Sequence, residues 1–310
     1  MNNEQFVNSP AYIRLLFAGF VIITIFLLFL FIGLAIAIPI FNIELNSLSK
    51  LFTPDTPDGI AFLKYMQIVQ SFGLFIVPPF IIAWFFSRQS FAYLKLDSSP
   101  KRISWSLAIC ILVMAIPTIN LLVLLNSHLD LPPFLSGLEN WMKESENNAQ
   151  KITEAFLKVN SVGGLLFNIF LIGVLPAIGE ELLFRGVIQR LFTEMTRNVH
   201  WGIFLAAFLF SALHFQFYGL IPRMLLGMLF GYLFVWSRTI WVPIIAHFTN
   251  NAIAVIFYYL NSSKIVEHNI DHLGTTNQNF YISILSAAGT IYLIWYFYKK
   301  HQERKIVAVG

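Results

Sequence analysis

Long apolar runs separated by short polar segments dominate this chain from one end to the other. Runs of spanning length fall at about residues 13–40, 65–86, 105–125, 162–193, 201–213, 221–236, 242–260 and 281–298. A helix needs roughly 20 apolar residues to cross a bilayer, so the pattern predicts about eight transmembrane helices. The run at 201 is short for a span and the run at 162 is long.

Composition places these helices in lipid. Apolar residues make up 57% of the chain, charged residues only 12%, and the mean hydropathy is +0.70. A soluble domain carries roughly 25% charged residues, so this chain has too little polar surface to cover a globule. We therefore expect an all-α, polytopic membrane protein whose residues 1–310 form one bundle in the lipid bilayer. The first run is too long for a signal peptide and is expected to be a retained span.

The distribution of basic residues predicts an orientation. With a cytoplasmic N-terminus, thirteen of the 20 Lys and Arg residues fall in inner segments and seven in outer ones. The positive-inside rule favours that arrangement, with both termini cytoplasmic in a multi-pass protein of the cell membrane. The net charge of +4 does not imply a nucleic-acid partner. The single cysteine, Cys110, excludes an intrachain disulfide and a cysteine-based metal cluster.

The longest predicted outer loop, residues 126–161, carries apolar residues at helical spacing among acids and amides. Such a pattern is typical of an amphipathic helix that lies in the membrane interface. The apolar positions are Leu138, Trp141, Met142, Ile152, Phe156 and Val159.

Charge inside the run 162–193 is the first sign of chemistry. Residues 179–186 read Gly-Glu-Glu-Leu-Leu-Phe-Arg-Gly, and each ionisable group in a membrane costs on the order of 3 kcal/mol. Glu181 and Arg185 stand four apart, in the favourable orientation for an ion pair. Glu180 points about 100° away and is free to act as a general base. The sequence leaves two alternatives open: exchanged roles for the two glutamates, and a buried ion cluster that locks helices together or lines a transport path.

Two further helices carry polar intrusions. His214 follows Phe210 by four positions on the fifth predicted helix, and His247 and Asn251 are four apart on the seventh. A single buried histidine is more often a packing residue than a ligand. Together with the two glutamates and Arg185, however, these side chains are costly to bury separately. We therefore predict one shared polar cavity.

Such a cavity suits hydrolysis in two ways. Glu180 could take a proton from water while a histidine and the Asn251 amide stabilise the oxyanion. Alternatively, Glu180, His214 and His247 could hold a zinc ion with an open position. The chain lacks the residues that a serine or aspartyl protease needs, because Gly-x-Ser-x-Gly is absent and every aspartate is expected in a loop. His-Glu-x-x-His is absent too.

The three motifs together resemble one known family. Glu-Glu-x-x-x-Arg at Glu180–Arg185, Phe-x-x-x-His at 210–214 and His-x-x-x-Asn at 247–251 follow the order and spacing of the CaaX protease and bacteriocin-processing (Abi) family. That family includes the type II CaaX prenyl endopeptidases. The resemblance covers about residues 165–260, the motif-bearing core.

The resemblance implies an eight-helix intramembrane endopeptidase. In it, Glu180 activates water, His214 assists, and His247 with Asn251 forms the oxyanion site. Whether members of the family use a metal ion is debated, and zinc is the candidate cofactor. The expected substrate is a membrane-associated peptide or protein, or a prenylated peptide. The rival interpretation is a catalytically silent scaffold, regulator or bacteriocin self-immunity protein. A proton-coupled transporter would show broken helices and repeat symmetry, and neither is visible in the sequence.

His268 and His272, in the loop 267–273, have a spacing that could bind metal. No helix is expected to fix them and further ligands are missing, so an exposed polar loop is the better interpretation.

The predicted orientation is tested by accessibility. A cysteine introduced near Arg190, in a chain whose Cys110 is replaced, should react with a membrane-impermeant thiol reagent only from the cytoplasmic side. Labelling only from outside would overturn the predicted topology.

Overall fold

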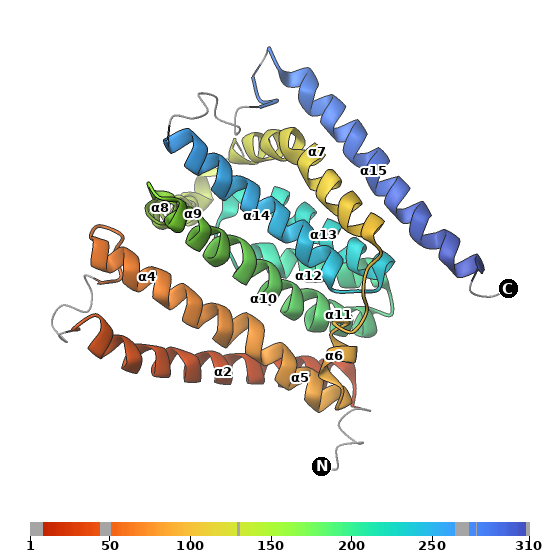
Figure 1. Cartoon of the computed structure of the whole chain (residues 1–310), viewed down its shortest axis with the longest axis horizontal. Helices are drawn as coiled ribbons and strands as arrows, with labels where there is room; N and C mark the ends of the chain where they lie inside the picture. The colour runs from red at the N-terminus through yellow and green to blue at the C-terminus, as the bar shows by residue number, and fades with distance from the viewer. Residues whose placement is uncertain (1–8, 44–50, 129–130, 264–272, 277, 308–310) are drawn as a thin grey trace.

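Helices make up the regular secondary structure of the computed structural model, which describes residues 9–43, 51–128, 131–263, 273–276 and 278–307. No strand occurs among these residues. The helices form the bundle seen in Figure 1. The predicted all-α fold class is therefore confirmed.

Seven helices in the described part are long and apolar enough to cross a membrane, so the chain is a multi-pass membrane protein. An eighth, α12 (Val199–Ala212), is shorter. Its 14 residues reach about 21 Å, less than the roughly 30 Å of a hydrocarbon core. The seven are α2 (Ala11–Ile40), α4–η2–α5 (Pro57–Gln70, Ser71–Ile76, Val77–Ser87), α7 (Arg102–Ser127), α9–η4–α10–η5–α11 (Val162–Asn168, Ile169–Val174, Leu175–Leu183, Phe184–Ile188, Gln189–Thr196), α13 (Leu220–Ser237), α14 (Trp241–Ser262) and α15 (Phe280–Val307).

The second span begins earlier than the hydrophobic pattern predicted. It starts at Pro57 because the Thr56 hydroxyl accepts a hydrogen bond from Gly59 N at 3.0 Å, and proline suits the first helical position. Asp58 therefore lies in the first turn of α4, not in a loop as expected. An acid there is favourable because it faces the positive end of the helix dipole.

Proline shapes the helix that carries the two glutamates. Pro176 has no N–H, so the carbonyl of Ile172, four residues back, loses its helical partner. The turn before it, η4, is a π-helix in which Leu175 N–H bonds to Phe170 O instead of Leu171 O. Two successive carbonyls are thereby left for side chains of other helices. π-turns of this kind often mark functional sites.

The helix α10 lies at the centre of the bundle, between α4–α5 and α14 (Figure 1). Its Ala177 and Leu182 belong to a buried cluster that includes Ala18 of α2, Ile82 of α5 and Ile244 of α14. At the edge of the bundle, α15 packs along α7. The central position surrounds the acidic pair with helices.

A helix does form in the predicted outer loop. This helix, α8 (Ser136–Leu157), follows a short turn, η3 (Pro133–Leu135). Phe156 is buried, and the Trp141 ring lies 5.3 Å from the ring of Phe217. That α8 rests on the outer leaflet stays a prediction. His268 and His272 lie outside the described residues.

Glycines let neighbouring helices approach closely. A Cβ built at Gly202 of α12 would lie 2.0 Å from Thr193 Oγ1 and 2.8 Å from the Thr193 backbone in α11. At Gly231 of α13, a Cβ would lie 2.9 Å from the Ile203 side chain. These contacts show that α12 packs closely against both α11 and α13.

We predict that two glycine-to-alanine changes differ in their effect on the free energy of unfolding. Gly202→Ala should lower the free energy of unfolding by about 1–3 kcal/mol, because its methyl group meets a helix backbone that cannot yield. Gly19→Ala in α2, where nothing lies within 4 Å of the new Cβ, should leave stability unchanged or raise it by up to about 1 kcal/mol. Denaturation in mild detergent measures both. Equal stability of the two variants would contradict the close packing.

Candidate active site

The two adjacent glutamates lie in α10, deep in the bundle. Glu181 is fully buried at 0% exposure, whereas the Glu180 side chain keeps 13%. The two carboxylates point to different neighbours, as consecutive helical residues must. Their surroundings therefore differ, although the residues are adjacent.

Glu181 forms the ion pair that its spacing predicted. Its Oε2 lies 2.9 Å from Nε of Arg185, which is also completely buried. The rings of Phe210 and Phe230 lie 5.4 and 5.9 Å from the centre of the guanidinium group. Those contacts stabilise a cation through the faces of the rings. The two Nη atoms of Arg185 have no hydrogen-bond partner among the described residues.

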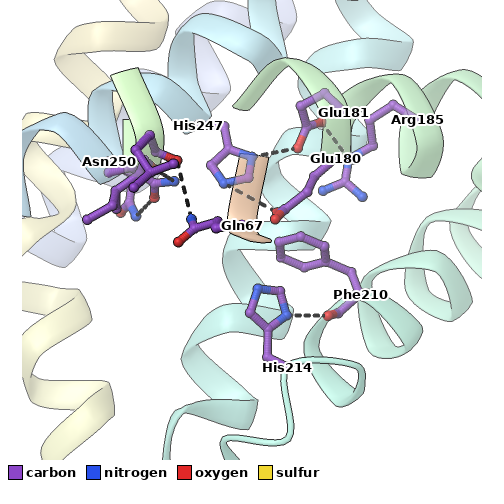
Figure 2. A network of polar contacts seen from close by, with 11 residues as sticks. Gln67, Glu180, Glu181, Arg185, Phe210, His214, His247 and Asn250 are labelled. Carbon is purple, nitrogen blue, oxygen red and sulfur yellow. Dashed lines mark hydrogen bonds and ion pairs between the residues drawn. The ribbon is translucent and has the colours of Figure 1, made fainter. Parts of the chain in front are cut away.

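His247 joins α14 to both glutamates, as Figure 2 shows. Its Nδ1 lies 3.0 Å from Glu181 Oε1, and its Nε2 lies 3.8 Å from Glu180 Oε2. Because a carboxylate only accepts, Nδ1 carries the hydrogen of that first contact. The imidazole ring stacks on Phe230 with ring centres 5.1 Å apart. His247 is thus oriented by a carboxylate that Arg185 holds in turn.

His214 lies beyond the end of a helix, which corrects the sequence-based expectation that it sits within the fifth one. The helix α12 ends at Ala212, and Phe215 takes a left-handed conformation with φ 52°. His214 nevertheless stays next to Phe210, because its Nδ1 donates to the Phe210 carbonyl at 2.7 Å. In the neutral ring this leaves Nε2 as an acceptor. Figure 2 shows the histidine on the opposite side of Phe210 from Arg185.

The Asn251 amide forms a hydrogen bond with the backbone of the π-turn η4 in the neighbouring helix. Its Nδ2 donates to Ile172 O at 3.1 Å, the carbonyl that Pro176 leaves without a helical partner. Its Oδ1 accepts from Asn250 Nδ2 at 3.1 Å. One amide hydrogen of Asn251 remains for other partners. The residue therefore has a structural contact that the motif alone did not reveal.

Gln67 of α4 was not singled out from the sequence. Its Nε2 donates to Leu171 O at 3.3 Å, the second carbonyl left over by the π-turn. The signal was available, because Gln67 is an amide inside a long apolar run. Phe230, which stacks on His247, carried no such signal among the many phenylalanines of the chain.

A cavity of about 550 Å³ connects these residues. Glu180, His214, His247 and Asn251 line it, whereas Glu181 and Arg185 lie behind His247 and support it. Gln67 and Arg223 also face this cavity. The predicted shared cavity thus exists for four of the six predicted site residues.

A second cavity of about 420 Å³ also reaches Glu180. Most of its lining is apolar and comes from α2, α4 and α8, including Phe26, Leu63 and Phe156. Glu180 is therefore the carboxylate at which an apolar space and a more polar one meet.

The arrangement does not fit the alternative zinc site. No group of three His, Cys, Asp or Glu side chains in the described part of the chain is placed to hold a metal ion. His214 bonds to a carbonyl on the far side of Phe210, while His247 contacts the two glutamates. Zinc binding by Glu180, His214 and His247 thus finds no support in this geometry, and no step below depends on it.

Comparison with known proteins matches the region that supplies most of the residues lining this cavity. Residues 162–253 match the family model described as type II CAAX prenyl endopeptidase Rce1-like. All three sequence motifs fall inside that segment. The match covers α9 to the middle of α14 and leaves the first three spans and α15 outside.

Two Bacillus subtilis proteins are similar to this chain. One, "Uncharacterized protein YpbD", is 31% identical over 108 residues, which is 33% of this chain and 52% of YpbD. The other, "Putative membrane peptidase YdiL", is 31% identical over 114 residues, 37% of this chain and 43% of YdiL. The matches thus span about half the length of these relatives or less. No solved structure matches.

The family match, the two relatives and the placement of the motifs agree with one another. Residues 162–253 of this chain are therefore similar to the type II CAAX prenyl endopeptidase Rce1-like proteins, in the segment that carries all three motifs.

Proposed function

We propose that this protein is an intramembrane endopeptidase in which Glu180 activates a water molecule to cleave a membrane-associated peptide. The observation that carries the proposal is the position of Glu180. Its carboxylate faces a cavity between helices that it shares with two imidazole rings, those of His214 and His247. Water held there would be close to a base and to hydrogen-bonding groups, as peptide hydrolysis requires.

The contacts of the buried cluster favour this division of roles. Arg185 compensates Glu181, and we assign a second proton to His247, which lies between the two glutamates. Glu181 at Nδ1 stabilises such an imidazolium. The second hydrogen would then lie on Nε2, facing the cavity. His247 is thereby suited to stabilise an oxyanion.

The reaction then proceeds in two steps. Glu180 takes a proton from water as the water oxygen bonds to the carbonyl carbon, and the carbonyl electron pair moves onto its oxygen. His247 Nε2–H stabilises that oxyanion. When the oxyanion collapses, the C–N bond breaks and Glu180 passes its proton to the leaving nitrogen. The neutral His214 ring orients the attacking water by accepting a hydrogen bond at Nε2.

Asn251 is assigned a positioning role together with a weaker contribution to the oxyanion site. Its bond to Ile172 O fixes the turn that precedes Glu180. The name of the matched family favours peptides with a prenylated C-terminus as substrates. The apolar cavity beside Glu180 is compatible with a lipid chain or with large apolar side chains.

Activity of purified variants tests the proposal. Glu180→Gln should lower turnover of fluorogenic membrane peptides by about 100-fold or more, because the amide cannot accept the proton. His214→Ala should lower it by roughly tenfold or more through loss of water orientation. Glu144→Gln, an exposed acid of α8, serves as the matched control and should behave like wild type.

Equal turnover in all of these proteins would rule out the proposed enzymatic function and favour a catalytically silent scaffold. The same assay with and without a chelator addresses the metal. We expect the rate to be unaffected by chelation; loss of activity that added zinc restores would contradict the mechanism proposed here.

The support given by Arg185 predicts a large effect on stability. Arg185→Leu leaves Glu181 buried without its cation and should cost about 3–5 kcal/mol of unfolding free energy. Arg14→Leu breaks the pair with Glu194, whose side chain is 41% exposed, and should cost less than about 1 kcal/mol. Denaturation in detergent compares them. Equal losses would show that the buried pair has no special role.

A further inference from the structure

Arg223 is a cation in the catalytic cavity that the proposed mechanism does not use. It lies in the first turn of α13 and lines the same cavity as Glu180 and His247. From the sequence alone, Arg223 was assigned no role in the chemistry. Its position inside the cavity therefore calls for a different explanation.

Neighbouring groups fix the guanidinium of Arg223. Its Nη2 donates to Gln216 Oε1 at 2.6 Å, and its Nη1 donates to Gln216 O at 3.3 Å. A Cβ at Gly219 would lie 3.1 Å from Nη2, so the absence of a side chain there leaves room for the group. A preorganised arginine loses little conformational entropy when it binds a ligand.

No carboxylate pairs with Arg223 among the described residues. The ion pairs found there join other groups. Glu146 and Glu180 influence Arg223 electrostatically, but Glu146 Oε2 accepts from Tyr218 N at 3.3 Å. Two of the five N–H donors of the guanidinium are occupied, which leaves three for a ligand. A carboxylate is the partner that such a fork binds best.

The spacing along α13 relates Arg223 to the reacting groups. Phe230, which stacks on His247, lies two turns further along, about 10 Å at 1.5 Å per residue. An extended peptide covers about 10 Å with roughly three residues. A peptide whose scissile bond lies at His247 could therefore place its own C-terminus near Arg223.

We infer that Arg223 binds the C-terminal carboxylate of the peptide substrate and so directs cleavage to a bond a few residues from the C-terminus. The inference rests on the proposed function and adds to it a residue that determines specificity. In this role the cavity between Glu180 and Arg223 holds the short fragment that is released.

Peptide binding to the full chain carrying Glu180→Gln tests this role without cleavage. The probe is a myristoylated, fluorescein-labelled dodecapeptide with three apolar C-terminal residues, made with a free carboxylate or as the carboxamide. The free acid should bind about tenfold or more tightly than the amide, the effect of a charge-assisted hydrogen bond. Adding Arg223→Gln should abolish that difference and leave amide binding unchanged. Lys143→Gln on the exposed face of α8 should preserve it.

Equal binding of acid and amide, absence of binding by both, or equal weakening of both by Arg223→Gln would overturn the inference. A lipid phosphate is the other source of an anion. If phosphatidylglycerol micelles bind in an Arg223-dependent manner while acid and amide peptides do not differ, the arginine contacts lipid and the inference is wrong. Acid-selective binding with no cleavage by the wild-type chain would support the inference and contradict only the proposed function.

Discussion

The cost of burying charge between membrane helices is the constraint on which this structure depends. Arg185 and Glu181 are completely buried, and they are tolerated because each compensates the other at 2.9 Å. His247 extends the pair across to α14, while Phe210 and Phe230 bring α12 and α13 against the same cation. Four helices thus meet at one electrostatic centre. Glu180 and His247 are the titratable members of this group that keep access to the cavity.

The backbone around the glutamates is adapted to the same centre. Pro176 and the π-turn η4 free two carbonyls, and amides from separate helices, Gln67 and Asn251, satisfy them. An unsatisfied carbonyl inside a membrane costs several kcal/mol, so these contacts fix the register between α4, α10 and α14. The two amides that line the cavity therefore also contribute to helix packing.

Much of the fold could be predicted because hydrophobic runs set helix positions almost directly. The runs placed every long span, and the spacing of Glu181 and Arg185 predicted their contact. Features that depend on tertiary contacts were not accessible. The early start of α4, the end of α12 before His214 and the position of His247 between two glutamates are set by caps and neighbouring helices. Gln67 and Arg223 are polar residues inside apolar runs that were not singled out from the sequence, because only the structure shows that both face the cavity.

The contact between Glu181 and His247 is the most direct test of this account. A double-mutant cycle with Glu181→Gln and His247→Ala, followed by denaturation in detergent, yields their coupling free energy. We expect about 1–3 kcal/mol, as for charged groups in direct contact within a buried network. Effects that add within about 0.5 kcal/mol would show that α10 and α14 are not joined through these side chains and would contradict the account.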